Sequence, residues 1–231
     1  MKRIEFLNTN NEKIVGVYRD AKSKGIFICC HGYQSTKDDD PVVKLSNAVY
    51  DQGYSIFRFD CSGHGESEGR RGIDLIKQTD DVLRAIDHFK EYKEIYIVGG
   101  SLGCAVGSMA AKINQKVNRL VLINGFFGTP ALGSKYIYVY LQFRLAALFS
   151  RWHRDNWNFL RKNLKPERIK ANTLILHARK DKDVYISQSR GFFSKLRTKK
   201  KLVVLKDADH DLSKQEYIDE IAGIIGEWLK N

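Results

Sequence analysis

The sequence predicts an α/β protein: an eight-stranded, mostly parallel sheet with helices on both faces. Two observations lead to this prediction. Short runs of β-branched and aromatic residues alternate with longer segments of helical periodicity, the order that produces parallel strands joined by crossover helices. A chain of 231 residues that is 43% hydrophobic can also bury a sizeable core as one unit. We therefore expect residues 1–231 to form a single domain.

Eight segments have the composition and length of strands, because each is rich in Val, Ile, Leu, Phe or Tyr and is bounded by polar or glycine-containing stretches. No helical pattern separates the first two, so we expect them to form an antiparallel hairpin at one edge of the sheet. From the third segment onward, strands alternate with helices. The predicted strands are residues 3–7, 14–18, 26–30, 55–60, 95–99, 120–124, 173–177 and 202–206.

Helical patterns fill most of the gaps between these strands. One helix begins at "DDDP", where Pro41 is favourable in the first turn because its φ is fixed and no N–H is needed there. Others are predicted over residues 75–89, after Ser101 and from Ser187. The last helix has an apolar stripe at helical spacing that should face the core, formed by Tyr217, Ile221, Ile224, Ile225 and Trp228.

Residues 125–170 interrupt the alternation. The segment is too long for an ordinary loop and too aromatic for a disordered one, so we expect a small helical cap inserted after the sixth strand. It holds nine basic and two acidic residues, more than half of the net charge of +12. Such a surface attracts an anionic substrate or a membrane surface, although a solvated basic face explains the same charge. Nucleic acid is not an expected partner.

Targeting segments and metal motifs are not evident in the chain. The N-terminus becomes polar at Asn8, and the most apolar stretch, residues 136–149, is interrupted by Gln142 and Arg144. We therefore expect a cytoplasmic protein. The four cysteines form no C-x-x-C pair, which argues against a zinc site or a disulfide framework.

Two serines match G-x-S-x-G, the pattern of a sharp strand-to-helix turn that exposes a nucleophile. Ser67 in "GHGESEG" lies between Glu66 and Glu68, whose negative charges would oppose an oxyanion. Ser101 in "IYIVGGSLGCAV" directly follows a predicted strand and precedes small residues typical of a helix packed closely on a sheet. The context therefore favours Ser101.

The glycines on either side of Ser101 have a physical role. Gly99 and Gly103 leave room where the turn and the helix cross, because a side chain at either position would strike neighbouring backbone.

A base and an acid follow the last two predicted strands. "LILHARKDKDV" carries Asp181 and Asp183 after the seventh strand, and "LKDADHDL" carries His210 after the eighth. These residues should lie at the same sheet edge as Ser101, because the carboxyl ends of parallel strands share one edge. Serine, acid and histidine in this chain order are typical of hydrolases in which a serine attacks an acyl carbonyl.

These motifs resemble those of the α/β-hydrolase superfamily, in particular its compact, capped esterase, monoacylglycerol-lipase and cinnamoyl-esterase-like branch, grouped with serine aminopeptidase-like hydrolases. The resemblance covers nearly the whole chain. "CCHGYQS" is similar to the oxyanion loop, "FDCSGHGESEG" to the loop after the fourth strand, "GGSLG" to the nucleophile turn, "HARKDKDV" to the acid loop and "DADH" to the histidine loop.

The resemblance implies an α/β-hydrolase fold and a serine hydrolase that cleaves small or medium carboxylic esters without metal or cofactor. Ser101, Asp181 and His210 would form the catalytic triad. The spacing from the acid to Val184 favours Asp181 over Asp183. A peptidase, a thioesterase or an acyltransferase would use the same triad, and a binding module with a basic cap is an alternative from a different class.

The resemblance also implies an oxyanion hole formed by the backbone N–H groups of Tyr33 and Leu102. Ser67, His31, His64 and His177 would have structural roles. The chain departs from the family pattern at the residue before the nucleophile, where glycine replaces histidine or a bulky group and should enlarge the site. The residues expected to contact substrate are Gly32, Gly100, Phe126 and Phe127.

Overall fold

The computed structural model describes residues 1–128 and 137–230. Its strands form one sheet in the order β1-β2-β4-β3-β5-β6-β7-β8. The strands from β3 to β8 run parallel, whereas β1 and β2 form an antiparallel hairpin that pairs with β4. The predicted sheet is therefore confirmed. Its strands are β1 (Lys2–Leu7), β2 (Lys13–Arg19), β3 (Gly25–Cys30), β4 (Ser55–Phe59), β5 (Glu94–Gly100), β6 (Val117–Ile123), β7 (Asn172–Ala178) and β8 (Lys200–Leu205).

Three of the predicted strands extend one residue too far. Asp60, Asn124 and Lys206 lie just past β4, β6 and β8. The side chains of Asp60 and Asn124 instead form hydrogen bonds with the loops that surround the sheet edge. Polar residues at the carboxyl edge therefore connect loops rather than extend the ladder.

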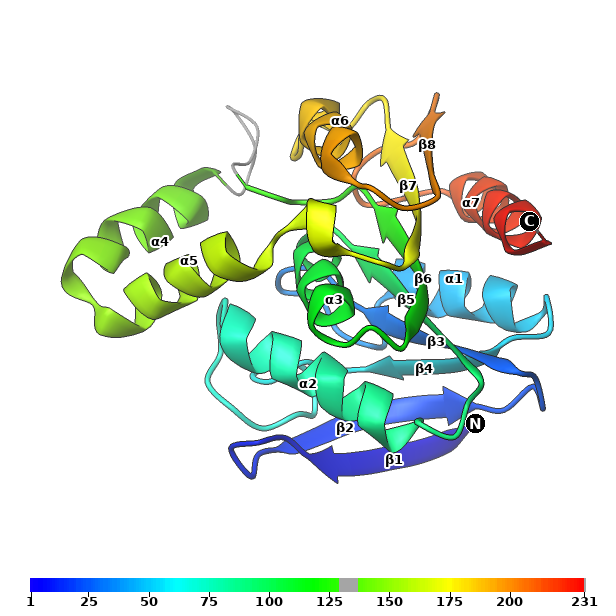
Figure 1. Cartoon of the computed structure of the whole chain (residues 1–231), viewed down its shortest axis with the longest axis horizontal. Coiled ribbons are helices and arrows are strands. Elements are labelled where there is room, and N and C mark those ends of the chain that lie inside the picture. Colours follow the sequence, from blue (N-terminus) through cyan, green and yellow to red (C-terminus); the bar gives the residue numbers. More distant parts are fainter. Residues whose placement is uncertain (129–136, 231) are drawn as a thin grey trace.

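Helices cover both faces of the sheet (Figure 1). One face carries the first and last helices, and the other carries α2, α3 and α6. The apolar stripe predicted for the last helix packs on the sheet, with Ile221 and Ile225 fully buried. Within residues 1–128 and 137–230, no helix has the length and apolar character needed to cross a membrane. The helices are α1 (Asp40–Tyr50), α2 (Leu75–His88), α3 (Leu102–Ile113), α6 (Ile186–Lys195) and α7 (Gln215–Lys230).

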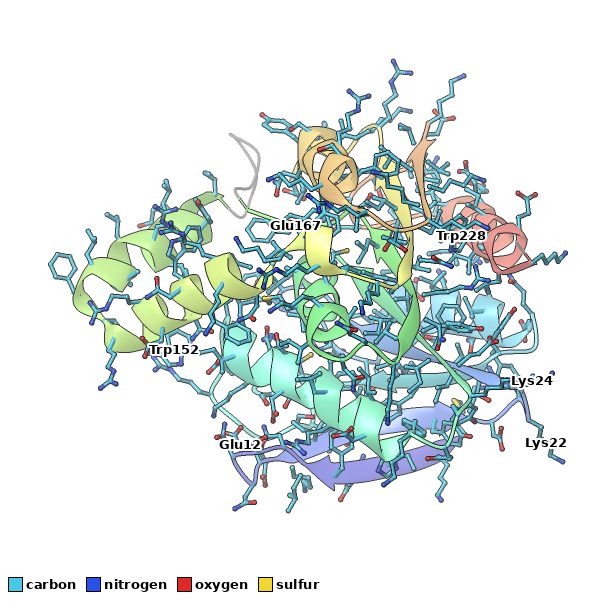
Figure 2. All side chains as sticks on the ribbon, viewed as in Figure 1. Glu12, Lys22, Lys24, Trp152, Glu167 and Trp228 are labelled. Atoms are coloured by element: carbon cyan, nitrogen blue, oxygen red, sulfur yellow. The ribbon has the colours of Figure 1, made fainter. Side chains whose placement is uncertain are left out.

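Two helices, α4 (Ile137–Phe149) and α5 (Arg151–Asn163), lie between β6 and β7 and are named the α4–α5 hairpin. Residues 129–136 of the predicted cap lie outside the described residues. The hairpin projects sideways beyond α2 and α3 (Figure 1). Its α5 helix is bound to the N-terminus of α2, because Trp152 Nε1 donates to Asp74 Oδ2 at 3.0 Å (Trp152 is labelled in Figure 2) and Ile76 N donates to Asn156 Oδ1 at 3.2 Å.

The sheet reverses its winding direction between β3 and β5. The chain adds β4 on one side of β3 and then β5 on the other. Loops that leave adjacent strands at such a point diverge and open a crevice at their carboxyl ends. Here the loop after β3 begins with His31, and Ser101 directly follows β5. The topology therefore places the loop after β3 and the turn at Ser101 beside this crevice.

Candidate active site

Ser101 alone connects β5 to α3, and its backbone is strained. Its φ is +50°, in the left-handed region that a residue with a side chain rarely adopts. Three hydrogen bonds hold this turn. The Ser101 N–H donates to Ile123 O at 3.0 Å, and the Ser101 carbonyl accepts from Cys104 N and Phe126 N, each at 3.1 Å. The hydroxyl is consequently fixed at the carboxyl edge of the sheet.

Gly99 and Gly103 permit the close packing that this turn requires. A Cβ on Gly99 would lie 2.6 Å from the carbonyl oxygen of Gly103. A Cβ on Gly103 would lie 2.2 Å from the carbonyl oxygen of Cys30, at the end of β3. Both distances are below van der Waals contact, so glycine brings α3 directly against β5 and the end of β3.

The structure brings Ser101, Asp181 and His210 together from three loops. Asp181 follows β7 and His210 follows β8. His210 Nε2 lies 3.1 Å from Ser101 Oγ, and His210 Nδ1 lies 2.7 Å from Asp181 Oδ2. The side chains of Asp181 and His210 are only 1% and 7% exposed. Hydrogen bonds in such a desolvated setting are stronger than in water, so this chain of contacts holds the imidazole ring in place.

The loop after β7 orients Asp181 rather than Asp183 toward His210. Asp181 Oδ1 accepts the N–H groups of Asp183 and Val184 at 2.8 and 2.7 Å, which directs Oδ2 to the imidazole. His177, fully buried, supports the same loop because its Nε2 lies 3.0 Å from the Val184 carbonyl oxygen. The backbone of this loop thus directs the carboxylate of Asp181, and not that of Asp183, to His210 Nδ1.

One cluster among the described residues has the spacing of a metal site. Potential ligand atoms of Asp183, His210 and Asp211 lie within 4.8 Å of one another. Both ring nitrogens of His210, however, are already in contact with Asp181 and Ser101. A metal on this cluster would compete with those two contacts, so the donor set does not fit a resident ion.

His31 fixes the loop that follows β3. Its Nε2 accepts the Cys61 N–H at 3.0 Å, and its Nδ1 lies 2.8 Å from Gly32 O. Burial lowers the pKa of His31 to about 4, so the ring is neutral at pH 7. Because Nε2 must accept, the proton of the neutral ring is on Nδ1 and is donated to Gly32 O. The predicted structural role of His31 agrees with these contacts.

Gly32 and Leu102 lie next to Ser101. A Cβ on Gly32 would be 3.3 Å from Ser101 Cβ, so the loop that continues into Tyr33 passes close to the serine. Leu102 is the first residue of α3, where a backbone N–H has no carbonyl partner within the helix. A helix N-terminus also favours negative charge. Both predicted donors therefore belong to segments adjacent to Ser101.

Asn124, which was predicted only as the end of a strand, has a larger role at the site. Its φ is +51°, and its side chain is buried. Asn124 Nδ2 donates to the carbonyls of Asp209 and His210, each at 3.0 Å, while its Oδ1 accepts the Ala178 N–H at 2.8 Å. It thereby ties the histidine loop to the end of β7. The sequence signal for this role is the position of Asn124, directly after β6, the strand that pairs with β5.

Two cavities reach Ser101. The first, named the α1 cavity, lies between α1 and the sheet, has a volume of about 380 Å³ and is lined in part by Gly32 and Gly100. The second, named the hairpin cavity, lies under the α4–α5 hairpin, has a volume of about 70 Å³ and is lined in part by Phe126. Three of the four predicted substrate contacts are therefore next to Ser101.

Phe127 is the exception. Its ring stacks on Phe192 of α6 with centroids 4.1 Å apart, and its N–H donates to Gln188 Oε1. It lines a separate surface hollow beside α6. Phe127 therefore lies on the side of α6, whereas its neighbour Phe126 lines the cavity that reaches Ser101.

Cys104 lies close to the nucleophile turn but is not exposed to the site. Its side chain is fully buried, with Sγ 3.0 Å from Gly99 O and 3.3 Å from Ile123 O. Burial raises the pKa of the thiol well above its usual range. Cys104 is therefore a packing residue.

Known proteins resemble this chain in sequence and in fold. The sequence profile of the family described as "Serine aminopeptidase, S33" matches residues 21–164. Protein phosphatase methylesterase 1 of Candida albicans is 29% identical over 102 residues, which cover 43% of this chain and 28% of that protein. The matched region is thus less than a third of that relative's length.

Solved structures share the fold over almost the whole chain. The Pyrococcus furiosus esterase Pf2001 superposes with a TM-score of 0.79 at 22% identity, covering 99% of this chain and 91% of the esterase. The monoacylglycerol lipase of Paleococcus ferrophilus has a TM-score of 0.77 at 18% identity, covering 99% and 98% of the two chains. With the family match, these similarities place the chain in the serine aminopeptidase-like (S33) family of the α/β-hydrolase superfamily.

Proposed function

We propose that this protein is a serine hydrolase that cleaves small or medium carboxylic esters through an acyl-enzyme. The observation that carries the proposal is the hydrogen-bonded chain from Ser101 through His210 to the buried Asp181. Nucleophile, base and orienting acid are the parts required for covalent acyl transfer. The esterase, lipase and methylesterase among the similar proteins support an ester as the substrate class.

The mechanism follows from this order of contacts. His210 Nε2 accepts the proton of Ser101 Oγ as the oxygen bonds to the acyl carbon, and Asp181 stabilises the resulting imidazolium. The backbone N–H groups of Tyr33 and Leu102 bind the oxyanion of the tetrahedral intermediate. His210 then protonates the leaving alcohol as its C–O bond breaks. Water, deprotonated by His210, then attacks the acyl carbon. The bond from this carbon to Ser101 Oγ breaks, the acid leaves, and His210 returns the proton to Oγ.

Covalent labelling tests the proposal most directly. A fluorophosphonate probe should react with the wild-type protein and with the S67A variant, but not with the S101A variant, and peptide mapping should place the adduct on Ser101. Labelling that persists in S101A, or is lost only in S67A, contradicts the assignment of the nucleophile.

A peptidase, a thioesterase or an acyltransferase would label in the same way. Turnover of matched p-nitrophenyl esters, acyl thioesters and aminoacyl p-nitroanilides separates these activities. We expect kcat/KM to be highest for the esters. A larger value for the aminoacyl amide contradicts the ester proposal while leaving the triad intact.

The outer face of α4 supports a second role for the hairpin, in binding an anionic lipid surface. Large apolar side chains on α4 are exposed at helical spacing, up to 90% for Phe149. Exposed basic residues on the hairpin would complement lipid phosphates, as in helices that lie in a membrane interface. The apolar residues are Tyr138, Leu141, Leu145, Leu148 and Phe149, and the basic ones are Arg144, Arg151, Arg154, Arg161 and Lys162.

Co-sedimentation with vesicles tests this role. Binding should be stronger to phosphatidylcholine vesicles that contain phosphatidylserine than to those without it, and should weaken in an L145S/L148S variant. Equal binding by the variant excludes the outer face of α4 as the contact. A binding protein without enzymatic activity, the alternative from a different class, would bind vesicles yet leave Ser101 unlabelled.

A further inference from the structure

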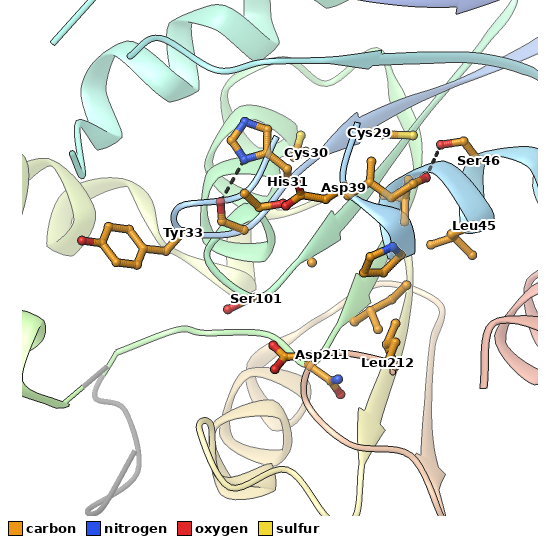
Figure 3. Close-up of a pocket in the computed structure, with 18 of the residues that line it drawn as sticks. Cys29, Cys30, His31, Tyr33, Asp39, Leu45, Ser46, Ser101, Asp211 and Leu212 are labelled. Carbon is orange, nitrogen blue, oxygen red and sulfur yellow. Dashed lines mark hydrogen bonds between the residues drawn. The ribbon is translucent and has the colours of Figure 1, made fainter. Parts of the chain in front are cut away.

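The α1 cavity extends from Ser101 into the core of the protein. With a volume of about 380 Å³, it is several times larger than the hairpin cavity and falls in the range of small-molecule sites. Figure 3 shows Ser101 and Asp211 near one end and Leu45 and Ser46 of α1 toward the other. Its inner part is lined by apolar side chains from four strands and α1, among them Phe27, Leu45, Val49, Ile56, Val98 and Ile123.

Gly100 lies directly before Ser101 and lines this cavity. Along β5, alternate residues point to the same face, and Tyr96 and Val98 pack into the core beneath α1. A side chain at position 100 would extend that row into the mouth of the cavity. A Cβ built on Gly100 meets no atom within 4 Å, so the space there is empty. The space that a side chain at this position would occupy is therefore free, directly beside Ser101.

The chemistry of the walls fits a hydrocarbon chain. Polar side chains such as Asp39, Asn124 and His210 line the mouth. Deeper in the cavity, the Ser46 hydroxyl donates to the Val42 carbonyl at 2.5 Å, so this polar group is already satisfied within α1. Phe27 and Ile56 at the inner part are almost completely buried. A polar mouth and an apolar interior match an ester carbonyl at Ser101 with its alkyl chain inside.

We propose that the α1 cavity binds the chain of a linear acyl group and that Gly100 admits it, so that the substrates are esters of medium-length unbranched acids. The inference rests on the esterase function proposed above. The acyl group, unlike the alcohol, stays bonded to Ser101 Oγ through both steps. Between those steps the alcohol must leave and water must reach the acyl carbon. The alcohol therefore needs a part of the site that is open to solvent, which an inner cavity is not.

A series of p-nitrophenyl esters from acetate through butyrate to octanoate tests the inference with a constant leaving group. In the wild-type protein, kcat/KM should rise by about fourfold for each methylene that enters the cavity. The G100V variant should lower the octanoate-to-acetate ratio of kcat/KM by about tenfold or more. L45W places a larger side chain in the cavity from α1 and should lower the same ratio. It tests the inference independently if G100V does not fold.

The matched control narrows the other cavity. I73F places a larger side chain in the hairpin cavity and should leave the octanoate-to-acetate ratio unchanged. An unchanged octanoate-to-acetate ratio in folded G100V and L45W overturns the inference. A decrease in this ratio confined to I73F also overturns it and assigns the acyl chain to the hairpin cavity.

Failure of the inference differs from failure of the proposed function. If Ser101 is labelled and acetate is hydrolysed while the ratio does not respond to G100V or L45W, only the acyl-chain assignment fails. If no ester is turned over and Ser101 resists labelling, both fail.

Discussion

Ser67 and Ser101 lie in the same G-x-S-x-G pattern, yet their surroundings differ completely. The Ser67 hydroxyl donates to the Asp60 carbonyl at 2.6 Å and accepts the Val15 N–H at 2.9 Å. The Ser101 hydroxyl lies 3.1 Å from His210 Nε2 on a strained turn between a strand and a helix. One hydroxyl connects two backbone segments, and the other faces a base at the edge of two cavities.

The acidic neighbours of Ser67 explain the difference further. Glu66 pairs with the buried Lys37 and with Arg3, each at 2.7 Å. Glu68 accepts the Lys13 N–H at 2.8 Å. The sequence around Ser67 therefore joins the N-terminal hairpin to the loop after β4. A nucleophile pattern thus has catalytic meaning only where a base lies opposite the hydroxyl.

The largest expected effect breaks the comparison at the hydroxyl itself. S101A should lower kcat for p-nitrophenyl butyrate by roughly ten-thousand- to million-fold, because no atom is left to form the acyl-enzyme. S67A should retain most of its kcat. The opposite pattern in a steady-state assay would reverse the roles of the two serines.

The next effect concerns the base opposite Ser101. D181N should lower kcat by about ten-thousand-fold, because an amide neither holds the productive imidazole tautomer nor stabilises the imidazolium. D183N is the matched control. It should lower kcat much less, because the Asp183 backbone N–H that binds Asp181 Oδ1 is kept in this variant. A greater loss in D183N would identify Asp183 as the acid.

His31 links the two regions, because its ring accepts a hydrogen bond from Cys61 N and donates one to Gly32 beside Ser101. Its pKa falls from 6.5 to about 4 on burial. Between these values the unfolded chain binds a proton that the folded protein does not, so the free energy of unfolding decreases as the pH falls. The decrease due to this group is of the order of 3 kcal/mol.

Urea unfolding of the wild-type protein and H31Q at pH 7 and at pH 4 measures this decrease. H31Q should lose that part of the pH dependence. If the two proteins have the same pH dependence, His31 is not a source of the acid sensitivity.

Asn124 sharpens the comparison, because it holds the histidine loop opposite Ser101. N124A should lower kcat by tens of fold with a smaller change in KM, as expected when a catalytic group loses its position. N118A is the control: Asn118 Oδ1 accepts the Ile95 N–H at 2.8 Å, at the opposite end of the sheet. Loss of this hydrogen bond in N118A should lower the free energy of unfolding and leave kcat unchanged. Equal kcat values for N124A and N118A would contradict a positioning role for Asn124.

The smallest expected effect is structural and belongs to Ser67. S67A leaves the Val15 N–H without its acceptor, so the free energy of unfolding should fall by about 1 to 3 kcal/mol. S194A, which removes an exposed hydroxyl bonded to Gly191 O, should change it by less than about 0.5 kcal/mol. Urea unfolding compares the two variants. Equal stabilities would mean that Ser67 does not support the loop.

Much of the fold and part of the site could be predicted because their signals are local. Strand composition, helix spacing and turn glycines indicate elements without knowledge of their neighbours. The order of Ser101, Asp181 and His210 after three strands then places them at one sheet edge. Phe127 and Asn124 could not be assigned in this way, because an aromatic ring and an amide each fit many environments until their partners are known.

The sequence by itself determined the alternation of strands and helices, the preference for Ser101 over Ser67 and the carboxyl edge as the location of Asp181 and His210. Only the tertiary structure decided that Asn124 supports the histidine loop, that Phe127 turns toward α6 and that the cavity beside Gly100 lies beneath α1. The physical reason is that side-chain periodicity is a property of one segment. A cavity or a shared hydrogen bond depends on the packing of segments that lie far apart along the chain.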